Sequence, residues 1–350
     1  MIRGMRTIYD LPLFNMEEML AGLGQKPYRA KQLYNWIYRK RAEGFEEMSD
    51  LPASLIETLK AEYVLMPLKL LDQQIARDRT AKYLFELSDG ATIETVLMRF
   101  NFGNSVCVST QVGCNMGCAF CASGLLKKQR DLTAGEIVAQ VMYIQKELDA
   151  AGERVDNIVV MGTGEPFDNY DNVMDFCSIV NSDHGLAIGA RHITISTCGV
   201  VPKIYEFAKG KYQYNLAISL HAPNDELRRE LMPIDRAYPL DQLMEALRAY
   251  SEDNHRRLTF EYILLKGVND SDAPAKELAD LIRGMNAYVN LIPYNEVDEH
   301  GFRTTDERTS LRFYDCIMKN GVKATLRSRH GDDIDAACGQ LRARHERNTG

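Results

Sequence analysis

The chain of 350 residues is 45% hydrophobic and 26% charged, an ordinary composition for a globular protein with one large core. It has no apolar run of about 18 residues, so we expect no membrane span. Residues 1–14 lack the apolar stretch of a secretory signal, so we expect a cytoplasmic protein. The formal net charge of −7 argues mildly against nucleic acid as a partner, and RNA binding would depend on local basic patches.

The chain begins with a helical pattern over residues 16–63. Apolar side chains recur there at helical spacing, at Leu20, Leu23, Leu33, Trp36 and Ile37. Two prolines, Pro27 and Pro52, interrupt the pattern. We therefore expect a small helical N-terminal domain over residues 1–66. Arg39–Arg41 is a basic segment of this domain, and its plainest interpretation is a solvated face.

A β-hairpin extension follows over residues 67–103. Lys82–Leu87 and Thr92–Leu97 are strand-like runs, and the Asp89-Gly90 pair between them is typical of a tight turn.

From residue 104 to residue 350, strand and helix patterns alternate. The expected strands are 105–110, 157–161, 192–197, 215–220, 259–265, 289–293 and 323–327. The expected helices are 133–148, 170–180, 240–250, 273–285 and 307–320. This alternation predicts an α/β fold with a parallel sheet, and six repeats indicate a partial (βα)6 barrel.

Chemistry in such barrels is found where strands end and loops begin. The sequence places its unusual motifs at those points: the cysteine loop after the first strand, then Gly162–Pro166, Ser196–Gly199 and His221–Asp225, with Asn295 after the sixth strand.

The cysteine loop has the spacing C-x3-C-x2-C, formed by Cys114, Cys118 and Cys121. A zinc site usually closes with a fourth Cys or His in a paired C-x2-C knuckle, and no second knuckle is present. Three thiolates suit a [4Fe–4S] cluster that leaves one iron open for a ligand. A zinc site that borrows a distant histidine is the alternative.

This spacing, on the loop after the first barrel strand, resembles the radical SAM superfamily. The resemblance implies a [4Fe–4S] cluster on the three cysteines and S-adenosylmethionine (SAM) on the open iron, where SAM is split to a 5′-deoxyadenosyl radical. It also implies that Gly164 and Glu165 of the Gly-Glu-Pro motif contact the SAM amino group. A glycine permits close backbone approach, and a carboxylate can pair with an ammonium group.

Further motifs resemble the RNA adenine methyltransferases of the RlmN/Cfr family over nearly the whole chain. They are Ser196, the run Ser219–Asp225, and the tail Asp333–Leu341 that contains Cys338. The resemblance implies that one SAM methylates Cys338 and that a second SAM supplies the radical. It implies a covalent protein–RNA adduct, with Glu94 as the base and with Cys107 forming a disulfide with Cys338 to release the product.

This chemistry is physically reasonable, because C2 and C8 of adenine are electron-poor and cannot accept a simple methyl transfer. A carbon radical can add there, and a thiol pair can then break the carbon–sulfur bond. By the same resemblance, SAM should be bound by Gly164, Glu165, Ser196, Ser219, Leu220, His221 and Asn295. Without it, Cys107 and Glu94 would be an ordinary buried thiol and an exposed strand residue.

Within the family, the branch that methylates C2 resembles this sequence more closely, because Pro166 completes the Gly-Glu-Pro motif and Ala222 follows Ser-Leu-His. This branch implies as substrates large-subunit ribosomal RNA, before full ribosome assembly, and the tRNA anticodon loop. It also implies two SAM molecules per turnover, a flavodoxin-type electron donor and a monomer. The N-terminal domain and the Lys127–Arg130 segment are then candidate phosphate contacts.

Three alternatives remain open. The chain could methylate C8 of ribosomal adenosine, as the branch linked to antibiotic resistance does. It could be a radical SAM enzyme that acts on a peptide or a small molecule, or an iron–sulfur or zinc RNA-binding module without enzymatic activity. Cys177 and Cys316 lie on expected helices and should be structural, and the sequence leaves the role of Cys198 open.

Overall fold

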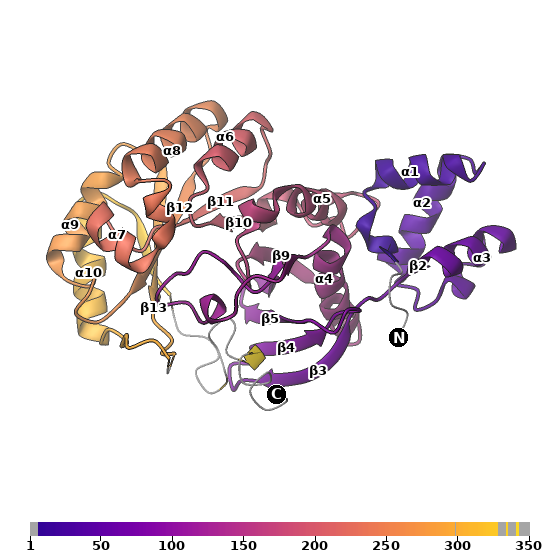
Figure 1. Ribbon diagram of the computed structural model, residues 1–350, viewed down its shortest axis with the longest axis horizontal. Helices are drawn as coiled ribbons and strands as arrows, with labels where there is room; N and C mark the ends of the chain where they lie inside the picture. Colours follow the sequence, from indigo (N-terminus) through magenta and orange to yellow (C-terminus); the bar gives the residue numbers. More distant parts are fainter. Residues whose placement is uncertain (1–5, 298, 328–333, 335–340, 343–350) are drawn as a thin grey trace.

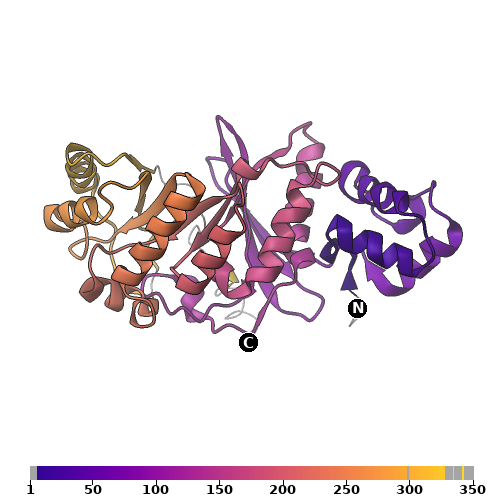
Figure 2. The ribbon, with the colours of Figure 1, turned by 90° about the horizontal axis from the view of Figure 1, so that it is seen from above.

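The computed structural model describes residues 6–297, 299–327, 334 and 341–342. The molecule is elongated, with the N-terminal helices at one end and helices α9 (Asp272–Leu281) and α10 (Glu307–Lys319) at the other (Figure 1). A curved sheet lies between the two ends and carries helices on its outer side. Figure 2 shows the N-terminal helices standing beyond one end of this sheet.

Ten strands form one continuous sheet in the order β14-β13-β12-β11-β10-β9-β6-β5-β4-β3. Its parallel strands are β6 (Gly103–Cys107), β9 (Val155–Val160), β10 (Ile193–Thr197), β11 (Asn215–Ser219), β12 (Leu258–Leu264), β13 (Ala287–Pro293) and β14 (Ala324–Leu326). Its antiparallel strands are β3 (Lys69–Ile75), β4 (Ala81–Glu86) and β5 (Thr92–Phe100). Because these strands are parallel, their carboxyl ends all meet at one edge of the sheet.

Helices cover the outer face of the parallel strands. They are α4 (Ala134–Asp149), α5 (Tyr170–Asn181), α6 (Val201–Lys209), α8 (Leu240–Asn254), α9 and α10. Helix α7 (Asp225–Leu231) instead packs at the carboxyl edge, where Leu231 lies with Ala122 and Cys198. The strands alternate accordingly: Ile193, Ile195 and Ile218 are buried in the core, whereas Ser196 and Ser219 face the interior of the barrel. Helix positions therefore follow from the apolar outer face of each strand.

The N-terminal domain consists of short helices closed by a two-stranded ladder. These elements are β1 (Arg6–Thr7), α1 (Leu13–Gly22), α2 (Tyr28–Tyr34), a π-helical turn (Asn35–Lys40), α3 (Ala53–Glu62) and β2 (Tyr63–Val64).

The N-terminal domain is attached to both ends of α4. Near the start of that helix, the Gly135 amide donates to Asp10 Oδ1 at 2.7 Å. At its end, Arg41 Nε lies 2.8 Å from Asp149 Oδ2. A Cβ at Gly135 would lie 2.3 Å from Thr7 Cγ2, so only glycine permits this close approach.

The predicted fold class is confirmed: the chain is an α/β protein with a partial barrel, a helical N-terminal domain and an antiparallel extension. The strands and helices expected from residue 81 onwards lie within a few residues of their observed positions. Strand β3 and helices α6 and α7 were not anticipated. Among the described residues, no helix is both long and apolar enough to cross a membrane.

Candidate active site

The cysteine loop leaves the sheet after β6 and is closed by a short antiparallel ladder between β7 (Gln111–Val112) and β8 (Arg130–Asp131). Its backbone is fixed by hydrogen bonds from the Cys114 amide to Leu126 O at 3.0 Å and from the Cys121 amide to Cys118 O at 3.1 Å. Gly113 has a φ of +79°, and a Cβ there would lie 2.2 Å from a backbone oxygen. The start of the loop therefore requires glycine.

Elements from the far side of the barrel hold the same loop. The Ala119 amide donates to Leu231 O, at the end of α7, at 2.9 Å. Tyr294 Oη donates to Phe120 O at 3.3 Å, and His300 Nε2 lies 3.2 Å from Cys121 O. The three cysteine side chains are thus presented by a loop that is braced from two directions.

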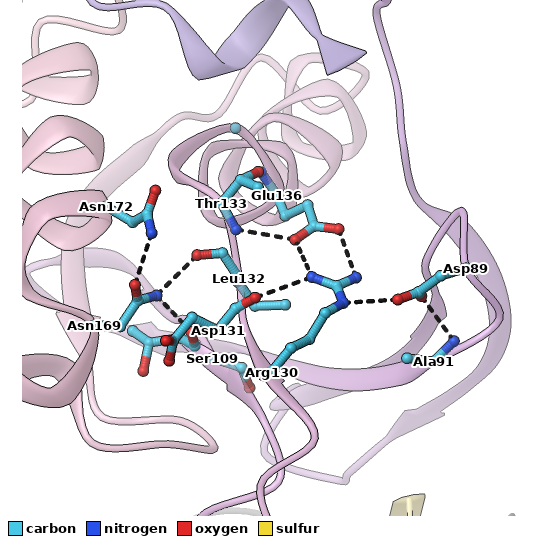
Figure 3. Close-up of polar contacts among 12 residues, drawn as sticks. Asp89, Ala91, Ser109, Arg130, Asp131, Leu132, Thr133, Glu136, Asn169 and Asn172 are labelled. Carbon is cyan, nitrogen blue, oxygen red and sulfur yellow. Dashed lines mark hydrogen bonds and ion pairs between the residues drawn. The ribbon is translucent and has the colours of Figure 1, made fainter. Parts of the chain in front are cut away.

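Arg130 fixes the end of the cysteine loop, as Figure 3 shows. Its guanidinium group binds both carboxylate oxygens of Glu136, at 2.7 and 2.9 Å, and Asp89 Oδ2 at 2.7 Å. Glu136 also accepts the Thr133 amide at 3.0 Å and completes the capping box at the start of α4. Arg130 therefore joins the hairpin turn, the cysteine loop and α4.

Lys128 is also engaged within the chain, since its Nζ lies 2.7 Å from Asp168 Oδ2 and 2.9 Å from Asp131 Oδ1. The Lys127–Arg130 segment was predicted as a phosphate contact. Two of its three cations form ion pairs inside the protein, so its role towards RNA stays a prediction that rests mainly on Lys127.

A cavity of about 290 Å³ lies at the carboxyl ends of the parallel strands. All three cluster cysteines line it, together with the predicted SAM contacts Gly164, Glu165, Ser196, Ser219 and His221. Two other predicted contacts, Leu220 and Asn295, are not among its lining residues. Leu220 is instead fully buried, and its amide donates to Glu261 O at 3.1 Å. Cys198, whose role the sequence left open, also lines the cavity.

Glu165 presents a fixed carboxylate at this cavity. Its Oε1 accepts the Phe167 amide at 2.9 Å, and its Oε2 accepts the Cys198 amide at 2.8 Å. Burial raises the pKa of Glu165, and these hydrogen bonds oppose that shift. The preceding Gly164 has a φ of +115°, and a Cβ there would lie 2.7 Å from Gln111 Cβ. A buried carboxylate beside a tight backbone turn suits an ammonium ligand.

Polar side chains from adjacent parallel strands form a row across the interior of the barrel. Ser219, Glu261 and Asn290 are register partners on β11, β12 and β13. Ser196 Oγ lies 3.4 Å from Ser219 Oγ, and Asn290 Nδ2 donates to Glu261 Oε1 at 2.9 Å. Arg327 Nη2, at 3.9 Å, lies beside the other oxygen of Glu261.

Glu261 was missed by the sequence reasoning. Burial raises the pKa of Glu261, and the charge of Arg327 and the Asn290 hydrogen bond oppose the shift. The available signal was a single carboxylate at an inward position of an otherwise apolar strand.

His221 is held as a neutral ring. Its Nδ1 accepts the Ile263 amide at 3.1 Å, and its own carbonyl accepts Asn269 Nδ2 at 2.9 Å. Burial, with a smaller contribution from the charge of Arg228, lowers the pKa of His221 to about 3. With Nδ1 as an acceptor, the ring proton is on Nε2, so His221 can donate a hydrogen bond to a ligand.

Arg228 is buried behind the cavity. Its Nη2 donates to Cys198 O at 2.6 Å, and its Nη1 lies 3.2 Å from Asp235 Oδ1. Since the Cys198 amide binds Glu165, Arg228 supports the Glu165 carboxylate through one intervening residue.

Two further predicted residues, Glu94 and Cys107, lie on β5 and β6, next to β4. Glu94 is buried, with Lys82 Nζ 3.0 Å from its Oε2 and the Arg342 amide 2.7 Å from its Oε1. Cys107 is the register partner of Val96, two residues after Glu94, so both side chains share one face of the sheet. The exposed position that the sequence alone favoured for Glu94 is wrong.

Ser109 links this group to the cavity. Its hydroxyl group donates to Glu94 O at 2.6 Å and accepts the Thr163 amide, in the glycine-rich loop, at 3.1 Å. Cys338 lies outside the described residues, so its pairing with Cys107 stays a prediction. No disulfide joins any two cysteines in the described ranges. Cys177 on α5 is buried and Cys316 on α10 is half-buried.

Comparison with known proteins identifies the family. Residues 7–65 match the ribosomal RNA large subunit methyltransferase N-terminal domain, and residues 108–279 match the radical SAM superfamily. A relative from Listeria monocytogenes, described as a probable dual-specificity RNA methyltransferase RlmN, is 56% identical over 98% of this chain and 95% of its own length. The chain belongs to the RlmN family of radical SAM RNA methyltransferases.

Other RlmN relatives and a solved structure agree. A relative from Streptococcus suis with the same description is 56% identical over 96% of this chain and 92% of its own length. A radical SAM methyltransferase structure from Sphaerobacter thermophilus is 46% identical, with a TM-score of 0.92 over 96% of this chain and 98% of that chain.

The cavity residues fit the groups that an RlmN family member uses, a [4Fe–4S] cluster and SAM. Three thiols surround one space on a braced loop, as a cluster with one thiolate on each of three irons requires. Burial raises the pKa of Cys114 to about 11, and iron coordination would stabilise its thiolate. Among the described residues, no group of three or more His, Cys, Asp or Glu side chains is arranged to hold a single metal ion.

Proposed function

We propose that this chain methylates C2 of adenosine in RNA through S-methylated Cys338 and a covalent protein–RNA adduct. The observation that carries the proposal is the placement of Glu94 and Cys107 on one sheet face, joined through Ser109 to the cysteine-lined cavity. A base and a thiol beside a radical SAM site are what this route needs, and simple methyl transfer needs neither.

The predicted site residues that line the cavity then have these roles. Cys114, Cys118 and Cys121 would hold the cluster, and Glu165 would pair with the amino group of SAM. Ser196 and Ser219 would bind its hydroxyl groups, and His221 would donate from Nε2. Gly164 admits the ligand to the backbone, while Leu220 and Asn295 remain predicted contacts. When bound, the cluster and SAM supply the 5′-deoxyadenosyl radical.

A methylene radical on Cys338 adds to C2 of adenine. The C2–H bond then breaks: its proton goes to the Glu94 carboxylate and its electron pair restores the aromatic ring. One electron is left over, and the cluster, when bound, would supply its acceptor. The Cys107 thiolate attacks the Cys338 sulfur, the sulfur–carbon bond breaks with its electron pair on carbon, and a proton completes the methyl group. The two cysteines end as a disulfide.

The proposed substrates are large-subunit ribosomal RNA and the tRNA anticodon loop. The relatives' description as dual-specificity RNA methyltransferases and the match of residues 7–65 to a ribosomal RNA methyltransferase domain support this choice. Loop adenines can be unstacked and inserted into a pocket, which a buried radical site requires. Two SAM molecules per turnover, a flavodoxin-type donor, a monomeric state and a cytoplasmic location complete the proposal.

The test is mass spectrometry of protein purified without oxygen, followed by nucleoside analysis of RNA after reaction with SAM and a reductant. We expect a methyl group on Cys338 and 2-methyladenosine in the RNA. If 8-methyladenosine forms instead, the mechanism stands and the C8 alternative replaces the C2 assignment. Unmodified Cys338 together with unmodified RNA would overturn the proposal.

A further inference from the structure

Lys82 occupies an unusual position for a lysine. It lies on β4 with 1% of its side chain exposed, and its Nζ is 3.0 Å from Glu94 Oε2. Glu94 is itself 4% exposed, so the pair is removed from solvent on both sides. Lysine is almost never fully buried without a partner, and here the partner is the proposed base.

The strand register places Lys82 on the face that carries the proposed chemistry. Lys82 is the partner of Val96 on β5, and Val96 is the partner of Cys107 on β6. Since side chains directly opposite each other share a face, Lys82 and Cys107 project to the same side, as does Glu94 two residues before Val96. The ammonium group therefore lies among the proposed reacting groups and not on the helix-covered side.

The two oxygens of Glu94 have different neighbours. Oε2 faces the ammonium group of Lys82, and Oε1 accepts the Arg342 amide at 2.7 Å. Two donors from different parts of the chain fix both the position and the plane of the carboxylate. A buried carboxylate that loses its counter-charge is strongly destabilised and changes its position or its protonation.

We propose that Lys82 is a positioning residue, which holds the Glu94 carboxylate in place for removal of the adenine C2 proton. This inference rests on the proposed function, because it requires Glu94 to be the base. The step that it serves breaks the C2–H bond, moves the proton to Glu94 and returns the electron pair to the ring. Radical formation and methylation of Cys338 precede this step and do not need Lys82.

A purely structural role of Lys82 predicts that Lys82→Met also loses 5′-deoxyadenosine formation, and not only the late step. A buried ion pair can often be replaced as a whole by apolar residues with little loss of stability, so the fold alone does not require the pair of Lys82 and Glu94. The same sheet contains a matched pair, Lys69 Nζ and Glu86 Oε2, which lie 2.8 Å apart on β3 and β4. Lys69 is 73% exposed and belongs to no proposed site, so Lys69→Met is the control.

The experiment compares Lys82→Met, Lys82→Arg, Glu94→Gln and Lys69→Met in single turnover, with RNA that carries hydrogen or deuterium at the target C2. It measures 5′-deoxyadenosine, the protein–RNA adduct and methylated adenosine. We expect Lys82→Met and Glu94→Gln to form 5′-deoxyadenosine within twofold of the unchanged protein. Both should accumulate the adduct, and Lys82→Met should form methylated adenosine about tenfold more slowly or worse, with a deuterium effect on that slow step. Lys82→Arg should recover much of the rate, and Lys69→Met should change nothing.

The outcomes separate the inference from the proposed function. If Glu94→Gln accumulates the adduct and Lys82→Met behaves like the unchanged protein, the inference is overturned and the role of Glu94 stands. If neither variant changes adduct or product, the assignment of Glu94 as the base fails, and the inference fails with it. If Lys82→Met loses 5′-deoxyadenosine formation as well, the role of Lys82 is structural and the inference is overturned. If Lys82→Met fails to fold, the double variant Lys82→Met/Glu94→Gln and the single variant Lys82→Arg replace it in the experiment. A folded double variant that forms no protein–RNA adduct overturns the inference.

Discussion

The buried pair between Arg228 and Asp235 gives a quantitative test of how the cavity wall is stabilised. Asp235 is fully buried, and Arg228 Nη1 lies 3.2 Å from it, while Arg228 Nη2 binds Cys198 O at 2.6 Å. After Arg228→Met, Arg229 is the ion-pair partner that remains for this buried carboxylate among the described residues; its Nε is 3.2 Å away and its side chain is 48% exposed. Breaking a buried pair costs about 3–5 kcal/mol, and the remaining partner places the expected loss near the lower end, about 3 kcal/mol.

The double variant Arg228→Met/Asp235→Leu removes both charges and should lose no more than about 1 kcal/mol, because no buried ion is left without a partner. Arg229→Met is the matched control and should cost about 1 kcal/mol or less, since its own side chain is largely solvated. Urea unfolding of the metal-free protein, followed by circular dichroism, measures all three. If the double variant is as unstable as Arg228→Met, the loss does not come from an uncompensated charge and the reasoning is refuted.

Three further predictions concern the cavity and its surroundings. Gly164→Ala should weaken SAM binding at least tenfold in calorimetry, because alanine is strained at a φ of +115° and its Cβ would lie 2.7 Å from Gln111; unchanged affinity would contradict the geometry. Since the folded pKa of His221, about 3, is below its usual value, the unfolded chain binds the extra proton and stability falls as the pH falls below about 6.5. Between pH 7 and pH 5, the free energy of unfolding of the His221→Gln variant, measured with urea, should therefore fall by about 2 kcal/mol less than that of the unchanged protein. Equal falls in both proteins would mean that His221 becomes charged in the fold. Lys127→Gln should lower the slope of log binding constant against log salt concentration for RNA by about one unit. Lys128→Gln should lower this slope less, because the Lys128 charge is already paired with Asp131 and Asp168. Equal effects of the two variants would show that these ion pairs open on binding.

The sequence was sufficient to predict those parts of the site that depend on local spacing. The cysteine loop follows from the positions of Cys114, Cys118 and Cys121. The helix expected from residue 133 is α4, and its start is fixed locally by Thr133 and Glu136. The alternation of apolar strands and amphipathic helices was likewise sufficient to predict the α/β architecture.

The features that were missed depend on contacts between distant segments. The neighbours Lys82 and Arg342 of Glu94 come from another strand and from the far end of the chain, so only the sheet register and the tertiary fold reveal them. Strand β3 is an edge strand with Asp72, Gln73 and Gln74 near its centre, so it lacks the apolar alternation that marks a strand. Helix α7 has only seven residues, too few for a clear helical period.

The attachment of the N-terminal domain to both ends of α4 fixes the position of this domain along the helix. Asp10 binds the start of this helix and Arg41 binds its end, so the domain is mounted on a rigid rod of 16 residues, about 24 Å long. If RNA phosphates contact this domain, as the sequence predicts, the interval between that contact and the nucleotide that enters the cavity would be fixed by the protein. Distance and shape, more than base sequence, would then choose which adenosine is modified.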